Sequence, residues 1–253
     1  MNEKGMEHLR GAHWSPAEQE VARELVEAFS NSADGLAIRL HNFTRYIRRQ
    51  ELTRLLVRHE LFKRILPVKG SIVECGVFHG FGLMAWLNLS AVLEPVNFSR
   101  RIYGFDTFKG FPAPSLQDNS NSVQHSAGEL RADSKAELLR LIGLHDRNRY
   151  LGHVPKVELI DGDATETIPR FLTQHPHTVV SLLFLDFDLY EPTRAAIECF
   201  LPRMPKGAII AFDEVDNPLW PGETRAMLDS LELRKLPLRR LEFDPVVAFA
   251  EIE

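Results

Sequence analysis

The sequence of 253 residues contains no apolar run long enough to span a membrane, and residues 1–14 lack the hydrophobic stretch of a signal peptide. It holds only two cysteines, Cys75 and Cys199, both in apolar segments and without the His or Cys spacing of a zinc site. We therefore expect two reduced, buried thiols, no structural zinc, and a cytoplasmic protein.

An excess of positive charge is also missing. Thirty Lys and Arg residues against 35 Asp and Glu residues give a net charge of −5, which disfavours an overall attraction to nucleic acid or to an anionic membrane. A small-molecule partner is expected instead.

With 44% hydrophobic and 26% charged residues, the chain is typical of a globular protein. We expect an N-terminal helical segment for docking or substrate contact over residues 1–66, and one large α/β domain over residues 67–253.

Residues 71–93 predict a strand, a glycine-rich turn and a helix. Glycines in such a turn let the backbone approach a ligand, and the helix N-terminus then offers N–H groups to an anion. The spacing differs from the Gly-x-Gly-x-x-Gly of dinucleotide-binding proteins and is similar to the signature of class I S-adenosylmethionine methyltransferases. The candidate cofactor-binding residues in this turn are Glu74, Gly76, Val77, Phe78, Gly80 and Gly82.

Two further predicted strands, 101–106 and 157–160, end beside acids that suit the same cofactor. Asp106, with Thr107 next to it, is placed to accept hydrogen bonds from two ribose hydroxyls. Asp163 has two possible roles: it caps the following helix, or it accepts a hydrogen bond from an adenine amino group.

Two more predicted strands end in pairs of acids. Asp186 and Asp188 follow the apolar run 179–185, whereas Asp213 and Glu214 follow residues 207–212. Because the carboxyl ends of parallel strands share one edge, these carboxylates should meet, and they repel one another unless a proton or a cation neutralises them. We expect Mg²⁺ bound by Asp186, Asp213 and Glu214. The alternative is that Asp186 and Asp188 cap the next helix or hydrogen-bond to loops.

The segments outside these strands are less informative. Ser15-Pro16-x-Glu18 and Ser134-x-x-Glu137 are capping-box patterns that predict helix starts. The arginine-rich segment 43–66 forms either a phosphate-binding face or, more simply, a solvated helix face. Residues 107–133 predict a long loop that is either a lid or disordered. Residues 238–243 and 246–252 predict an antiparallel hairpin.

Taken together, four motifs resemble the macrocin/mycinamicin family of metal-dependent sugar O-methyltransferases, over roughly residues 45–225. They are Glu74-x-Gly76-Val77-Phe78-x-Gly80, Gly104-Phe105-Asp106-Thr107-Phe108-x-Gly110, Leu185-Asp186-x-Asp188-Leu189-Tyr190-Glu191, and Phe212-Asp213-Glu214. The chain departs from the family at Glu214, where a second Asp is usual, and at Phe187, where a small residue is usual.

The resemblance implies a Rossmann-like class I methyltransferase fold with a mostly parallel seven-stranded sheet, an antiparallel C-terminal hairpin and helices on both faces. It also implies S-adenosylmethionine, Mg²⁺ and the hydroxyl of a deoxysugar, either nucleotide-linked or in a glycoside, in antibiotic or other secondary metabolism. The sugar oxygen would attack the sulfonium methyl in line, with Asp186 at the ion. His125 is the candidate general base, and Asp188 is the second candidate.

Other interpretations remain open. The same fold could serve a cephalosporin-hydroxylase-like reaction or another small-molecule reaction, or the chain could be a non-catalytic cofactor-binding module. The apolar N-terminal helices favour a homo-oligomer.

Overall fold

The computed structural model describes residues 15–120 and 123–253, and the chain divides into two compact units between Leu56 and Val57. This boundary lies inside helix α4 (Arg49–Ile65), earlier than the expected one after residue 66. The reason is that the second half of α4 contributes Val57, Leu61, Phe62 and Ile65 to the core of the second unit, where all four side chains are fully buried.

The first unit contains helices α2 (Pro16–Ser30) and α3 (Leu36–His41) and the start of α4. α2 begins with the capping box that the sequence predicted. Ser15 Oγ accepts a hydrogen bond from the Glu18 N–H at 3.3 Å, and the Glu18 carboxylate accepts one from the Ser15 N–H at 3.0 Å. No residue of α2 or α3, both fully described, is buried. The docking role of this segment stays a prediction.

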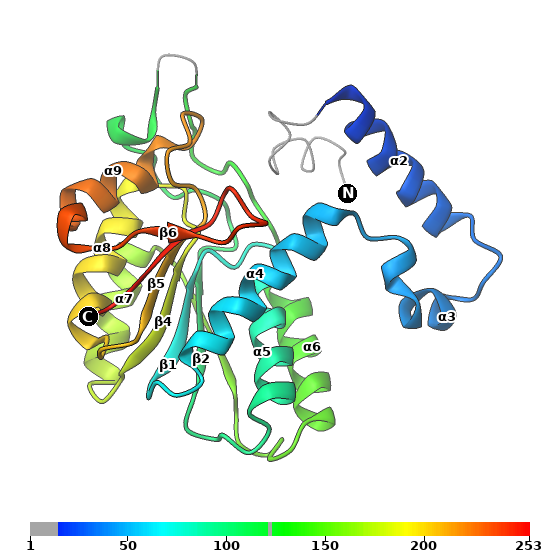
Figure 1. Cartoon of the computed structure of the whole chain (residues 1–253), viewed down its shortest axis with the longest axis horizontal. Coiled ribbons are helices and arrows are strands. Elements are labelled where there is room, and N and C mark those ends of the chain that lie inside the picture. The colour runs from blue at the N-terminus through cyan, green and yellow to red at the C-terminus, as the bar shows by residue number, and fades with distance from the viewer. Residues whose placement is uncertain (1–14, 121–122) are drawn as a thin grey trace. The chain divides into compact units, whose positions relative to one another are not determined.

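The second unit is built on a seven-stranded sheet of order β3-β2-β1-β4-β5-β7-β6 (Figure 1). β1 to β5 are parallel, and β7 runs antiparallel to both β5 and β6. The predicted fold class and C-terminal hairpin are therefore confirmed. The strands are β1 (Ser71–Cys75), β2 (Ile102–Asp106), β3 (Val157–Asp161), β4 (Val180–Leu185), β5 (Ile209–Phe212), β6 (Arg239–Arg240) and β7 (Ala248–Glu251).

Helices cover both faces of this sheet. On one face lie the end of α4, α5 (Phe81–Leu93) and α6 (Lys135–Asn148); on the other lie α7 (Ala164–Gln174), α8 (Tyr190–Phe200) and α9 (Pro221–Ser230) (Figure 1). Every residue of β1, β4 and β5 is buried, as expected for central parallel strands covered on both sides. Burial of these three strands holds their carboxyl ends at one edge of the sheet.

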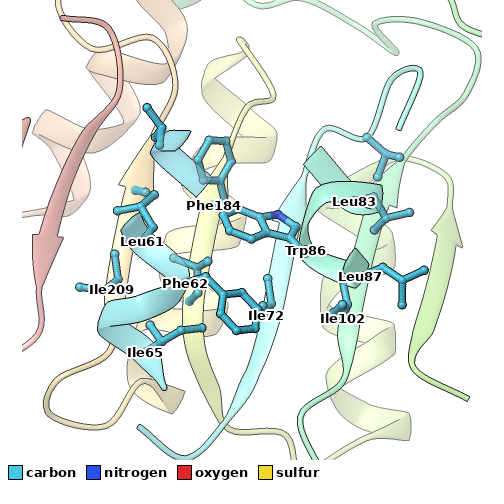
Figure 2. Packing of buried hydrophobic residues seen from close by; sticks show 14 of the residues in the cluster. Leu61, Phe62, Ile65, Ile72, Leu83, Trp86, Leu87, Ile102, Phe184 and Ile209 are labelled. Carbon is cyan, nitrogen blue, oxygen red and sulfur yellow. The ribbon is translucent and has the colours of Figure 1, made fainter. Parts of the chain in front are cut away.

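Trp86 of α5 is the largest side chain in the core of the first face (Figure 2). Its ring stacks on Phe62 at a centroid distance of 6.5 Å and meets Phe184 of β4 edge-on at 5.8 Å. Together these contacts join α4, α5 and the sheet.

The two cysteines are free thiols; Cys75 is fully buried as expected, whereas Cys199 is only partly buried. Burial raises the pKa of the Cys75 thiol well above its usual value. None of the helices in the described ranges is both long and apolar enough to cross a membrane.

Candidate active site

The turn after β1 lies directly against the end of β4. Gly76 has a φ of +95°, and a Cβ on it would lie 1.9 Å from the carbonyl oxygen of Asp186. The Asp186 N–H donates to the Cys75 carbonyl oxygen at 2.8 Å. Gly76 is therefore required by the close approach of two strand ends. This is the point where the strand order reverses, which is where open α/β sheets bind ligands.

Asp106, from the end of β2, holds this turn in place. Its Oδ2 accepts hydrogen bonds from the N–H groups of Val77 and Phe78, both at 2.7 Å, and its Oδ1 accepts one from Phe108 at 2.6 Å. These two amides belong to the turn before α5, so the anion site that the sequence suggested at the N-terminus of α5, which begins at Phe81, stays a prediction. A carboxylate oxygen accepts two hydrogen bonds, so Oδ1 can accept one more, for example from a ribose hydroxyl.

Thr107 and Asp163 shape the neighbouring loops. The Thr107 hydroxyl donates to the Gly110 carbonyl at 2.6 Å. Asp163 Oδ1 accepts from the N–H and the hydroxyl of Thr165, at 2.9 and 2.7 Å, and so caps α7. The capping role that the sequence left open is confirmed, whereas the adenine contact stays a prediction.

Glu74 faces the core instead of the crevice. It shares a side of β1 with Ile72, because alternate residues of a strand point the same way, and it is 1% exposed. Its Oε1 lies 3.8 Å from Nη2 of Arg58, which is equally buried. A Cβ on Gly82 would lie 1.7 Å from that oxygen, so Gly82 makes room for the carboxylate. Glu74 therefore supports the turn from the core side of the sheet. Because Arg58 is buried beside it, Arg58 is not part of a solvated helix face.

The acids after β4 and β5 start from adjacent backbone positions. Leu185 pairs with Phe212, so Asp186 and Asp213 leave the sheet side by side, on strands about 4.8 Å apart. The Asp213 N–H donates to the Leu185 carbonyl at 2.9 Å. Asp213 and Glu214 are both buried, at 4% and 7% exposure.

A further carboxylate, Glu223 in the first turn of α9, was missed by the sequence analysis. It is fully buried, and its Oε1 accepts a hydrogen bond from the Glu214 N–H at 2.9 Å. Burial holds the pKa of the Glu223 carboxyl well above its usual value, and the charges of Asp188, Asp213 and Glu214 raise it further, against a lowering by the bond from Glu214. The hydrogen bond from the Glu214 N–H places Glu223 beside the acids that follow β5. In the sequence, the only sign of this position was Pro221, which favours the start of a helix and so places Glu223 in its first turn.

These side chains suit a hard divalent cation, because carboxylate oxygens are its preferred ligands and their mutual repulsion favours a neutralising charge. Among residues 15–120 and 123–253, however, no three His, Cys, Asp or Glu side chains are grouped closely enough to hold a metal ion. One oxygen of Glu214 accepts a hydrogen bond from the Asn217 amide at 2.5 Å. Binding of Mg²⁺ by Asp186, Asp213 and Glu214 therefore stays a prediction, and it requires side-chain movement.

The loop 107–133, which includes the undescribed residues 121 and 122, is attached to this edge at several points. Asp118 is buried and accepts a hydrogen bond from the N–H of Tyr190, the first residue of α8, at 2.6 Å. α6 begins directly after Ser134, as the sequence predicted, but the Ser134 hydroxyl donates to the Phe78 carbonyl at 2.5 Å and does not cap the helix, so only the predicted capping bond is wrong. The described part of the loop is thus attached to the edge of the sheet where the parallel strands end, and its role as a lid stays a prediction.

His125 links this loop to the segment before α9. Its ring stacks on Trp220 at 4.3 Å with an interplanar angle of 13°. Nε2 lies 2.9 Å from the Leu219 carbonyl oxygen, and Nδ1 lies 3.2 Å from Glu129 Oε2. Because a carbonyl oxygen only accepts hydrogen bonds, Nε2 carries a proton. With both nitrogens engaged, this geometry favours a structural role over that of a general base.

Replacing His125 by Phe is expected to lower the free energy of unfolding by about 1–2 kcal/mol, because the ring still stacks but two hydrogen bonds are lost. Turnover should fall less than about tenfold, and the pH profile of kcat should keep its shape. Urea unfolding and a pH–rate profile measure the two effects. A loss of the pH-dependent limb together with a fall of about 100-fold would identify His125 as the base after all.

Comparison with known proteins agrees with this architecture. The methyltransferase domain profile matches residues 73–215, which include the carboxyl ends of the five parallel strands β1 to β5. The crystal structure of the calicheamicin methyltransferase CalS11 is 39% identical, with a TM-score of 0.90 and 94% of both chains covered. An apo structure of CalS11, described as a TDP-rhamnose 3′-O-methyltransferase, is 38% identical, with a TM-score of 0.82 and coverage of 94% of this chain and 96% of that one.

The O-methyltransferase NovP, at 17% identity, a TM-score of 0.54 and 79% coverage of both chains, shares the fold. Among curated proteins, none matches the chain significantly. The profile match covers more than half of the sequence, and the CalS11 similarity extends over nearly all of it. On this evidence the chain is an enzyme that belongs to the methyltransferase domain family.

Proposed function

We propose that this enzyme transfers the methyl group of S-adenosylmethionine to a hydroxyl of a nucleotide-linked deoxysugar in secondary-metabolite biosynthesis. The similarity to CalS11, at 39% identity over 94% of the chain, carries the proposal. A structure of that relative is described as a TDP-rhamnose 3′-O-methyltransferase. The motifs shared with the macrocin/mycinamicin family point to the same type of substrate.

The cofactor site in this proposal is the crevice where the strand order reverses, between the ends of β1 and β4. Gly76 lets the backbone turn there without a side chain, and Asp106 keeps the turn rigid through its bonds to Val77 and Phe78. Oδ1 of Asp106 can accept one more hydrogen bond, which suits a ribose hydroxyl, and Asp163, which follows β3, would accept one from the adenine amino group.

The acceptor site in this proposal is the group of acids beside the crevice. Asp186, Asp213 and Glu214 would hold Mg²⁺, which when bound lowers the pKa of a coordinated hydroxyl and fixes its orientation. Asp188 replaces His125 as the preferred proton acceptor, since the His125 ring is occupied by Leu219 and Glu129. Asp188 lies partly exposed at this edge, with a φ of +61°.

Binding of phosphate by the arginines of the first unit stays a prediction, because several of them are already paired with acids. Arg49 bonds to Glu18, and Arg48 bonds to Glu51.

A homo-oligomer formed through apolar side chains of the first unit also belongs to the proposal, because Leu36, Leu40 and Phe43 are between 47% and 75% exposed.

Methyl transfer to a panel of acceptors tests this function. We expect transfer to dTDP-deoxyhexoses, much slower transfer to the matching sugars without the nucleotide, loss of activity in EDTA, and recovery with Mg²⁺. Calorimetry should show binding of S-adenosylmethionine and none of NAD. Preference for finished glycosides would overturn the nucleotide-linked substrate, and full activity in EDTA would overturn the cation.

A further inference from the structure

The first turn of α9 is hydrogen-bonded to the segment that follows β5. Glu223 Oε1 accepts a hydrogen bond from the Glu214 N–H at 2.9 Å, and the Thr224 hydroxyl donates to the Glu214 carbonyl at 3.2 Å. The same hydroxyl accepts a hydrogen bond from the Asp216 N–H at 2.9 Å. Two adjacent side chains of α9 therefore bond to both backbone groups of Glu214.

The helix can come this close because Gly222 precedes Glu223. A Cβ on Gly222 would lie 2.2 Å from the Asp118 carboxylate and 2.7 Å from the Asp188 carbonyl oxygen. The start of α9 is thus pressed against the turn after β4 as well as against the segment after β5. Glu223 therefore enters the acidic group from a helix, whereas the other acids enter it from the ends of strands.

The second carboxylate oxygen of Glu223 points to a ligand. Glu223 is fully buried, and among the described residues its Oε2 has no hydrogen-bond partner. A buried carboxylate oxygen without a partner is costly, and such atoms in native proteins usually serve a bound group. Glu223 bonds to the backbone of Glu214, which directly follows Asp213, and the preceding Gly222 lies against the carbonyl oxygen of Asp188.

We propose that Glu223 is a positioning residue that fixes the Asp213–Glu214 turn for cation binding. This inference rests on the proposed function and adds a residue outside the predicted ligand set. Through Oε1, Glu223 fixes the peptide that joins the two acids, so that both side chains leave the turn in defined directions. Residues that orient metal ligands in this way typically change metal affinity about 10- to 100-fold when they are lost.

Binding of Mn²⁺ alone to the full chain, followed by electron paramagnetic resonance, tests the inference. We expect Glu223→Ala to weaken Mn²⁺ binding by about 10- to 100-fold, because the Glu214 N–H loses its acceptor. Glu223→Gln keeps a carbonyl oxygen for that N–H and should stay within about threefold of the parent. Asp229→Asn is the matched control and should leave binding unchanged, because Asp229 is exposed at the end of α9, where it bonds to the Tyr190 hydroxyl. Binding of S-adenosylhomocysteine to every variant reports that the fold is intact.

The outcomes separate the possible roles. If Glu223→Ala binds Mn²⁺ as well as the parent does, the positioning role is overturned and the proposed function stands. If Glu223→Gln loses as much affinity as Glu223→Ala, the charge of Glu223 acts directly on the ion and the positioning role is again wrong. If the parent protein binds no Mn²⁺, the cation and the role of Glu223 are both overturned.

Discussion

Replacing Asp213 by Asn is expected to slow methyl transfer by about 100-fold or more while S-adenosylmethionine still binds. Asn has the same size and keeps one carbonyl oxygen, but it removes the negative charge that a divalent cation requires. The backbone bond from Asp213 to the Leu185 carbonyl does not involve the side chain, so β5 stays in place. The turn at Gly76 lies on a different strand and should be unaffected.

Steady-state kinetics and calorimetry with S-adenosylhomocysteine measure the two halves of this prediction. The expected change is in kcat, with the cofactor Kd within about threefold of the parent value. Asp216→Asn is the control: Asp216 is exposed, and its backbone has a φ of +61°, which Asn tolerates. Loss of cofactor binding in Asp213→Asn would show that the two sites are not separate, and unchanged turnover would remove the cation from the mechanism.

Replacing Gly76 by Ala should lower the free energy of unfolding by about 3 kcal/mol or more and abolish cofactor binding. A φ of +95° is strained for Ala by about 1–2 kcal/mol. The added Cβ would also lie 1.9 Å from the Asp186 carbonyl oxygen, a backbone atom that cannot rotate away. The ends of β1 and β4 must therefore separate, which moves the turn held by Asp106.

Urea unfolding and calorimetry with S-adenosylhomocysteine measure these effects, and Gly143→Ala provides the control. Gly143 lies within α6 and does not have a positive φ, and a Cβ added to it would have no neighbouring atom within 4 Å. Ala there should raise the stability by about 0.5–1 kcal/mol. If Gly76→Ala is as stable as the parent and binds the cofactor, the close approach of the two strands is not essential.

Much of the fold was predictable because the strands are marked by buried apolar runs and the helices by their spacing. The run 179–185 predicted β4 almost to the residue, and the tail predicted the antiparallel β6 and β7. The convergence of strand ends was predictable for the same reason, since parallel strands deliver their carboxyl ends to one edge. Asp186 and Asp213 do leave neighbouring strands.

The contacts of individual side chains were less predictable, because they depend on elements far apart in the chain. The burial of Glu74 against Arg58 requires α4 to pack on β1, which no local pattern indicates. The engagement of His125 depends on Leu219, 94 residues away. Glu223 enters the acidic group only because α9 returns to the edge of the sheet.

By itself, the sequence determined the order of strands and helices along the chain and the acids that follow the strands. It could do so because hydrophobic periodicity and turn residues are local properties. The tertiary structure alone decided which of those acids hold the backbone and which face the crevice. Asp106 bonds to the turn, Glu74 faces the core, and Glu223 joins from α9. The physical reason is that a carboxylate is satisfied by the nearest donor in space, and packing brings that donor from anywhere in the chain.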